Sequence, residues 1–141
     1  MSAELIELSN ALAQTTESSA ASAVAVHTES RGSSSGVIWR PGIIATAEHA
    51  LRRDEAIQVT PTDTAVVPAT LVGRDPSTDL AVLKCAEANI AAKLGNASSL
   101  KPGSITLVVG RTRVSGPVAA LGVVSLVAAE RRTWTGASCA P

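Results

Sequence analysis

Residues 75–83 read Asp-Pro-Ser-Thr-Asp-Leu-Ala-Val-Leu, a polar turn that leads directly into an apolar run. Asp79 is the last polar residue of this turn, and the mainly apolar run continues to residue 85. Earlier in the chain, residues 43–49 read Ile-Ile-Ala-Thr-Ala-Glu-His, so a second apolar run is followed closely by His49. Each stretch places one acid–base side chain at the end of a predicted strand, where a rigid sheet holds it while it faces open space.

The rest of the chain is also divided into short apolar segments by Gly, Pro and polar turn residues. Val24 and Val26 alternate with other residues in a strand pattern, which predicts an exposed His27 because His27 is out of phase with both valines. A loop is expected at residues 32–36 and a turn at residues 40–42. Pro68 should confine its strand to an edge or a bulge, since proline has no N–H to donate. Strands are predicted at residues 23–27, 37–39, 43–46, 56–60, 65–72, 80–85, 104–109 and 118–128, a pattern typical of an all-β barrel or sandwich.

The first residues follow a different period. Leu5, Leu8 and Leu12 recur at helical spacing and predict a short amphipathic helix over residues 3–14. Residues 15–21 are rich in Ser and Thr, and we expect them to connect this helix to the first strand.

The composition argues against several classes of function. Lys plus Arg and Asp plus Glu both number 12, so this neutral chain has no electrostatic reason to bind nucleic acid or an anionic membrane. Hydrophobic residues make up 45% of the chain without any Phe or Tyr, so the core must be built from aliphatic side chains. Neither cysteine has a metal-ligand spacing: Cys85 fits a buried position and Cys139 lies in a polar tail, so we expect no metal and no cofactor. No membrane span and no signal peptide are visible, which leaves the compartment unknown, with the cytoplasm as the default.

His49 and Asp79 are the residue types that activate a serine nucleophile. A serine hydroxyl needs a base to take its proton, and the base needs a carboxylate that orients it and stabilises its charged form. Residues 46–49, Thr-Ala-Glu-His, are similar to the trypsin-like signature around the catalytic His. Residues 75–83 resemble the HtrA (Deg) branch of that superfamily, in which the second Asp is the acid of the triad. By this resemblance, His49 is the general base and Asp79 is the residue that orients it.

Further segments extend the resemblance in the same order, so that it covers about residues 24–127. They are residues 35–38, 68–75, 94–103 and 121–125. Residues 110–113, Gly-Arg-Thr-Arg, depart from the Gly-Asn-Pro of the family, so the loop there differs.

The resemblance implies an all-β, chymotrypsin-like double β-barrel, with the first barrel complete, the second partial, and a short N-terminal α-helix in front. We expect residues 1–21 to form the helix and linker. Residues 22–100 should form the first β-barrel, which carries His49 and Asp79. Residues 101–141 should form the partial second β-barrel and a tail.

The nucleophile of the family is not present in its usual pattern. No Gly-x-Ser-Gly-Gly occurs in the 141 residues, and the family spacing places the serine after Pro141. Ser115 lacks the preceding Gly-x and comes too early, and Ser138 has no strand after it to support an oxyanion hole. We expect neither serine to act as the nucleophile.

The resemblance therefore predicts a serine-type endopeptidase that acts on polypeptides, with the 141 residues inactive on their own. The alternative is a non-catalytic β-barrel module that binds a partner and derives from a protease. The apolar residues 118–128 would lack strand partners on at least one side, which predicts self-association. Proteases of the family that the chain resembles often work in the cell envelope, so this compartment stands beside the cytoplasm as an alternative.

Overall fold

The computed structural model describes residues 2–28, 32–52, 56–62, 65–112, 116–127, 131–132 and 138–139. One α-helix comes first, α1 (Ala3–Ala20), and the short 3-10 helices η1 (Glu48–Ala50) and η2 (Ala97–Ser99) follow later. Six strands lie between α1 and η2: β1 (Ala23–Thr28), β2 (Gly32–Arg40), β3 (Ile43–Ala47), β4 (Ile57–Pro61), β5 (Val67–Asp75) and β6 (Leu80–Lys84). Four more follow η2: β7 (Ile105–Thr112), β8 (Gly116–Val123), β9 (Arg131–Arg132) and β10 (Ser138–Cys139).

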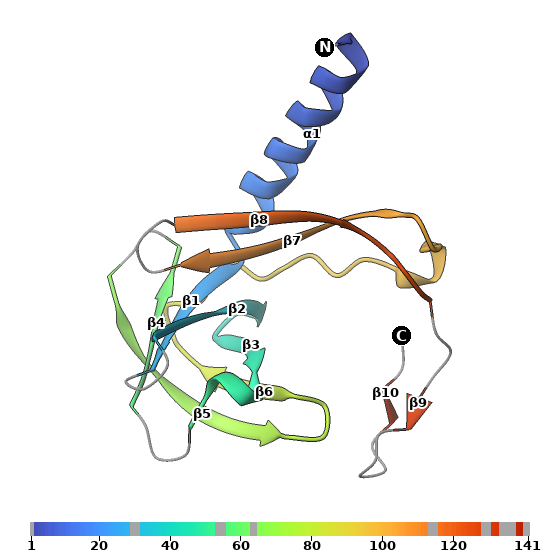
Figure 1. The fold of residues 1–141 in the computed structure, drawn as a ribbon. Coiled ribbons are helices and arrows are strands. Elements are labelled where there is room, and N and C mark those ends of the chain that lie inside the picture. The colour runs from blue at the N-terminus through green and yellow to red at the C-terminus, as the bar shows by residue number, and fades with distance from the viewer. Residues whose placement is uncertain are drawn as a thin grey trace.

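The first six strands close into a barrel in the order β1-β2-β3-β6-β5-β4, with every neighbouring pair antiparallel (Figure 1). A barrel has no open sheet edge, so the backbone groups of these short strands find partners on both sides. The predicted all-β class, with a complete first barrel and a helix in front of it, is confirmed. Two smaller two-stranded sheets, β7–β8 and β9–β10, complete the described part.

The barrel core is aliphatic, as the composition requires. Its largest fully buried side chains include Ile38, Ile44 and Leu83, which come from three adjacent strands. Gly36 lets β2 and β3 approach closely, because a Cβ at this position would lie only 2.8 Å from Ile44 Cγ2. Cys85 is buried in the same cluster, as the sequence predicted.

Two sequence expectations for the start of the chain are wrong. Residues 32–36 are not a loop but the first half of β2, because they pair with β1 from Thr28↔Gly32 to Val24↔Gly36. The helix does not end near residue 14 but continues through the Ser/Thr-rich segment to Ala20. Thr15 and Thr16 donate their hydroxyls to the carbonyls of Ala11 and Leu12, so these side chains bond within the helix rather than leave it.

Pro68 fits its position in the barrel. β5 pairs with β4 around Pro68, but its pairing with β6 begins only at Thr70 and includes a register shift between Leu71 and Gly73. Pro68 therefore lies in a stretch with one ladder neighbour, where a missing N–H is tolerated.

The β7–β8 hairpin is joined to the barrel through β2. Ser35 on β2 donates its hydroxyl to the Arg111 carbonyl and accepts the Arg111 backbone N–H, at 3.1 and 3.0 Å. Gly110 makes this approach possible, since a Cβ there would lie 2.6 Å from Ser35 Oγ. On β3, Thr46 donates its hydroxyl to the Ser35 carbonyl at 2.9 Å. A polar chain thus runs from β7 through β2 to the strand that ends before His49.

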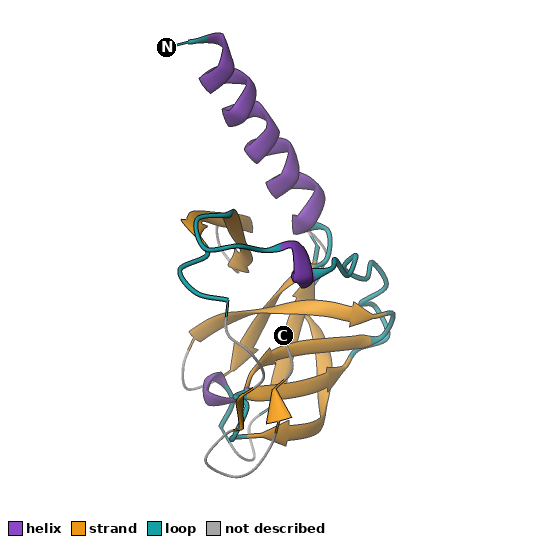
Figure 2. Cartoon of the chain, turned by 90° about the vertical axis from the view of Figure 1, so that its right-hand side faces the viewer, coloured by secondary structure: helices purple, strands orange, loops and turns teal. Residues whose placement is uncertain are grey.

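The side chain of Arg111 also fixes the end of α1. Its guanidinium is buried and donates to the carbonyls of Ala20, the last helical residue, and Ala23, at 3.1 and 2.9 Å. A cation at a helix C-terminus is favoured by the helix dipole and satisfies carbonyls that have no partner within the helix. From this anchored end, α1 projects away from the barrel, with Leu5, Ile6 and Leu8 exposed (Figures 1 and 2). No helix in the described ranges is both long and apolar enough to cross a membrane.

Candidate functional site

Strand pairing brings His49 and Asp79 together. β3 and β6 are antiparallel neighbours, and their last register pair is Ala47↔Leu80. The residues just beyond this pair are the start of η1 on one strand and Asp79 on the other. Two residues that are thirty positions apart in sequence therefore meet at one end of the barrel.

Asp79 contacts His49 twice. Its Oδ1 accepts the backbone N–H of His49 at 2.9 Å, and its Oδ2 lies 2.6 Å from His49 Nδ1. The Asp79 carbonyl also accepts the N–H of Glu48 at 3.0 Å. The pair is open to solvent, with 69% of the His49 side chain and 50% of the Asp79 side chain exposed.

The turn before β6 is shaped by its own polar residues. Asp75 accepts the Ser77 N–H and hydroxyl at Oδ1 and the Thr78 hydroxyl at Oδ2, at 2.9, 2.6 and 2.9 Å. This arrangement agrees with the turn role that the sequence assigns to Asp75. Asp79 then adopts a φ of +56°, a left-handed conformation that is uncommon outside glycine but that Asp and Asn tolerate best.

The hydrogen bonds also determine the charge state of Asp79. The backbone N–H of His49, followed by its side chain, lowers the pKa of the Asp79 carboxyl, so the group is ionised near neutral pH. An ionised carboxylate only accepts hydrogen bonds, so Nδ1 of His49 must be the donor. In the neutral ring, Nε2 is then left with a lone pair that can accept a proton.

No nucleophile contacts this lone pair in the described ranges. Within them, His49 forms no hydrogen bond other than those to Asp79. Ser115, which the sequence rejects as nucleophile, lies outside the described residues. Ser138 is described only through its backbone pairing in the β9–β10 sheet.

The sequence assigns no role to Glu48, yet its carboxylate forms an ion pair with Arg74, with Oε1 and Nη1 3.2 Å apart. Arg74 Nη2 also approaches the carbonyls of Leu51 and Arg52, both at 3.4 Å. The available signal in the sequence was a pair of opposite charges: Glu48 directly precedes His49, and Arg74 directly precedes residues 75–83. Simple alternation along β5 does not predict that Arg74 faces Glu48. The register shift between Leu71 and Gly73 changes the face that each later side chain of β5 occupies.

Two other titratable side chains of the barrel, those of His27 and Cys85, differ from this exposed pair because both are buried. His27 is buried rather than exposed, and its Nε2 lies 2.8 Å from Thr60 Oγ1 on the neighbouring β4. This correction arises because both faces of β1 are covered, so alternation does not distinguish them. Burial raises the pKa of the Cys85 thiol, which disfavours a reactive thiolate. The described residues contain no group of three His, Cys, Asp or Glu side chains that could hold a metal ion.

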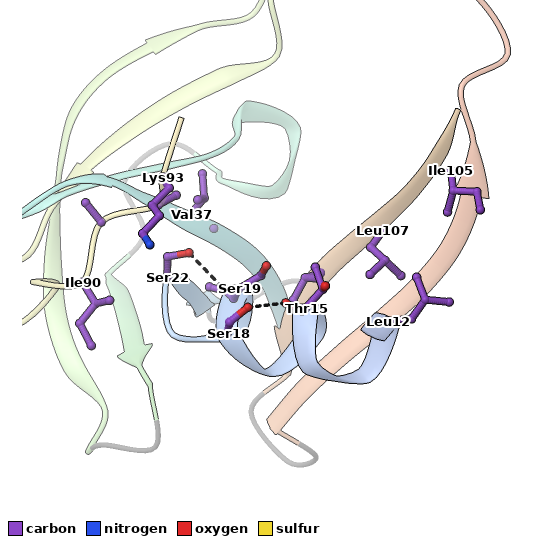
Figure 3. A pocket seen from close by; sticks show the side chains of 15 residues that line it. Leu12, Thr15, Ser18, Ser19, Ser22, Val37, Ile90, Lys93, Ile105 and Leu107 are labelled. Atoms are coloured by element: carbon purple, nitrogen blue, oxygen red, sulfur yellow. Dashed lines mark hydrogen bonds between the residues drawn. The ribbon is translucent and has the colours of Figure 1, made fainter. Parts of the chain in front are cut away.

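A separate pocket of about 670 Å³ lies between the last turns of α1, residues 90–93 and one face of β7 (Figure 3). Its lining combines the hydroxyls of Ser18, Ser19 and Ser22 with the apolar side chains of Ile90 and Leu107. Neither His49 nor Asp79 is among the lining residues. The pocket is therefore distinct from the candidate active site.

A closed antiparallel barrel with a His–Asp pair at one end has the features of the trypsin-like class that the sequence resembles. The chain belongs to the family of the trypsin-like peptidase domain, whose model matches residues 34–140.

Individual relatives agree with this assignment. The chain is 35% identical over 85 residues to a "Probable periplasmic serine endoprotease DegP-like" of Chlamydia pneumoniae, a match that covers 60% of this chain and 17% of the relative. A protein of the same description from Pseudomonas savastanoi pv. phaseolicola is 38% identical over 84 residues, covering 58% of this chain and 18% of the relative. Among solved structures, the serine endoprotease from Yersinia pestis matches with a TM-score of 0.70 and 31% identity, over 81% of this chain and 44% of that chain.

These relatives confirm the resemblance to the HtrA (Deg) branch. They are also much longer than this chain, which spans about a sixth of the length of the two curated proteins.

Proposed function

We propose that this chain carries the base and the acid of a serine-type endopeptidase, with His49 as the general base and Asp79 as the carboxylate that orients it. The observation that carries the proposal is the double contact from Asp79 to the backbone N–H and the Nδ1 of His49. Membership in the trypsin-like peptidase family supports polypeptides as substrates.

In this reaction, His49 Nε2 takes the proton of a serine hydroxyl while the oxygen attacks the peptide carbonyl, and it later gives that proton to the leaving amine. Asp79 remains ionised and stabilises the imidazolium that forms between these steps. Activation of this kind needs a hydroxyl within about 3 Å of Nε2. Because no described residue supplies one, we further propose that the 141-residue chain alone does not hydrolyse peptides.

A fluorophosphonate probe tests this inactivity directly, since it labels only an activated serine. We expect the native chain and His49→Ala to show the same weak background labelling. Specific labelling of the native chain that disappears in His49→Ala would contradict the proposal. Peptide mapping of the label would then identify the serine, with Ser115 and Ser138 as the first positions to inspect.

The alternative is a non-catalytic β-barrel module that keeps the scaffold without the chemistry. This alternative is favoured because His49 is exposed and Asp79 is its only side-chain partner among the described residues, so no described nucleophile is activated. Sequencing the encoding DNA beyond codon 141 separates the two functions. A downstream Gly-x-Ser-Gly-Gly in frame supports the endopeptidase, whereas a genuine stop codon directly after Pro141 supports the module.

A further inference from the structure

His49 lies on a turn that makes few packing contacts of its own. η1 contains only three residues, none of them buried, and the His49 side chain is mostly exposed. The nearest core anchor is Leu51, just after the turn, which is buried in the barrel cluster. The direction of the imidazole ring must therefore depend on polar contacts to the turn.

Arg74 supplies such contacts on both sides of His49. Its guanidinium forms the ion pair with Glu48, which precedes His49, and reaches the carbonyls of Leu51 and Arg52, which follow it. The two carbonyl contacts are long at 3.4 Å, so the ion pair at 3.2 Å is the stronger link. Arginine suits this position because its planar fork can contact several acceptors at once.

The ion pair lies between the barrel and the turn. Arg74 is paired with Ala81 on β6, and Ala81 is paired with Thr46 on β3, so Arg74 lies two strands away from the chain that enters η1. Its side chain is 19% exposed and that of Glu48 is 17% exposed, so solvent screens this pair less than it screens the open His49–Asp79 pair. Glu48 is thus held at two points, its N–H by the Asp79 carbonyl and its carboxylate by Arg74.

We propose that Glu48 and Arg74 are positioning residues that hold the η1 turn so that His49 Nδ1 faces Asp79. The proposal rests on the assignment of His49 and Asp79 as base and acid, which it extends by two residues. Its consequence is that the tautomer with the proton on Nδ1 depends on an ion pair that touches neither ring nitrogen.

The tautomer of His49 can be measured without any peptidase activity. Nitrogen-15 NMR of the imidazole distinguishes protonation at Nδ1 from protonation at Nε2, and spectra recorded over a pH series show which signals belong to the neutral ring. In the native chain, we expect the Nδ1–H form to dominate. In Glu48→Gln and in Arg74→Gln, the ratio of Nδ1–H to Nε2–H should fall by about tenfold, a size typical of coupling between neighbouring groups.

Two further variants separate positioning from general stability. Arg74→Lys keeps the positive charge but lacks the planar guanidinium that contacts several acceptors. Its ratio of Nδ1–H to Nε2–H should therefore lie between those of Arg74→Gln and the native chain. Arg40→Gln removes another arginine, exposed on β2 of the same barrel, and should leave the ratio unchanged. Glu48→Gln is nearly isosteric, so it keeps the test valid even if Arg74→Gln does not fold.

The outcomes distinguish this inference from the proposed function. A ratio that stays native in Glu48→Gln and Arg74→Gln overturns the positioning role, while a ratio that falls in Asp79→Asn leaves the His49–Asp79 assignment intact. A ratio that does not respond to Asp79→Asn contradicts both.

Discussion

Asp79 combines a strained backbone with a favourable charge. Its left-handed φ of +56° costs energy, and the two hydrogen bonds from His49 to its carboxylate oppose that cost. Asp75 acts nearby by a different route, since hydroxyls rather than an imidazole hold its carboxylate. Both carboxyls stabilise the end of the barrel where the candidate site lies.

These carboxyls predict an acid-dependent loss of stability. The pKa of Asp79 is lowered chiefly by the His49 N–H, and that of Asp75 chiefly by the Ser77 hydroxyl. A carboxyl whose pKa is lower in the folded state stabilises the fold above its unfolded pKa, about 3.9, and loses this contribution as the pH falls through the folded value. Asp79→Asn and Asp75→Asn should therefore be less stable than the native chain at pH 6, with a gap that narrows toward acid.

Urea unfolding midpoints over a pH series measure this gap. Glu4→Gln, at an exposed position of α1, serves as the control and should follow the native chain. A gap that stays constant down to the lowest pH would show that the lost contribution does not depend on ionisation.

Gly36 is the residue whose size most limits the packing of β2 on β3. Gly36→Ala would bring a methyl group to 2.8 Å from Ile44 Cγ2 and 3.1 Å from the Ala45 carbonyl oxygen. We expect a loss of about 1–3 kcal/mol in the free energy of unfolding, as is usual for an overpacked core. Gly73→Ala is the matched control on β5, because nothing lies within 4 Å of its added Cβ. Equal thermal unfolding midpoints for the two variants would contradict this reading of the β2–β3 contact.

Among the elements, α1 and the β7–β8 hairpin lie in contact, and the side chain of Arg111 anchors the end of α1 to β7. Arg111 extends from β7 to the carbonyls of Ala20 and Ala23, at the junction of α1 and β1. The Ser/Thr-rich residues 15–20 have modest helix propensity, so the helix end depends on this tertiary contact. The anchor explains why the helix extends beyond the sequence prediction.

Arg111→Met should release this junction. The substitution keeps an unbranched side chain but removes every donor, so two buried carbonyls lose their partners at a cost of about 2–3 kcal/mol. Hydrogen exchange of the backbone amides in the last turn of α1 should become faster, and the unfolding midpoint should fall. Arg40→Met, at an exposed arginine, should change neither quantity. Unchanged exchange in Arg111→Met would mean that other contacts hold the helix end.

The molecule as a whole is uneven in how it covers its apolar surface. The barrel encloses its core, whereas β8 pairs with β7 alone among the strands of the described ranges and exposes large side chains along its length. An open strand edge with apolar residues is a template for pairing with another chain. Because the net charge is zero, long-range repulsion does not oppose such contacts.

We therefore expect concentration-dependent self-association of the isolated chain through β8. Leu121→Lys places a charge on this strand, where the leucine is 62% exposed, and should raise the monomer fraction in sedimentation velocity experiments. Leu5→Lys adds the same charge at an exposed position of α1 and should have the smaller effect. A native chain that remains a single monomeric species at high micromolar concentration would contradict this expectation.

The sequence was most informative where short-range pattern and structure agree. Apolar runs bounded by Pro, Gly and polar turns predicted six barrel strands, because strand length and turn chemistry are local properties. The ends of the runs at residues 43–46 and 80–85, together with the resemblance to the HtrA (Deg) branch, pointed to His49 and Asp79 as the candidate pair. The same reasoning failed for His27 and for residues 32–36, since alternation cannot show that both faces of β1 are covered or that serines and glycines pair with it.

By itself, the sequence determined the β-rich class and the aliphatic core, because both depend on residue types and their local spacing. Its resemblance to the HtrA (Deg) branch also pointed to the two residues of the candidate site. Only the tertiary structure decided how His49 is held. The Ala47↔Leu80 register sets its distance from Asp79, and the bulge in β5 precedes Arg74, which lies against Glu48. Strand order and register arise from the closure of the whole barrel, which joins segments far apart in the chain.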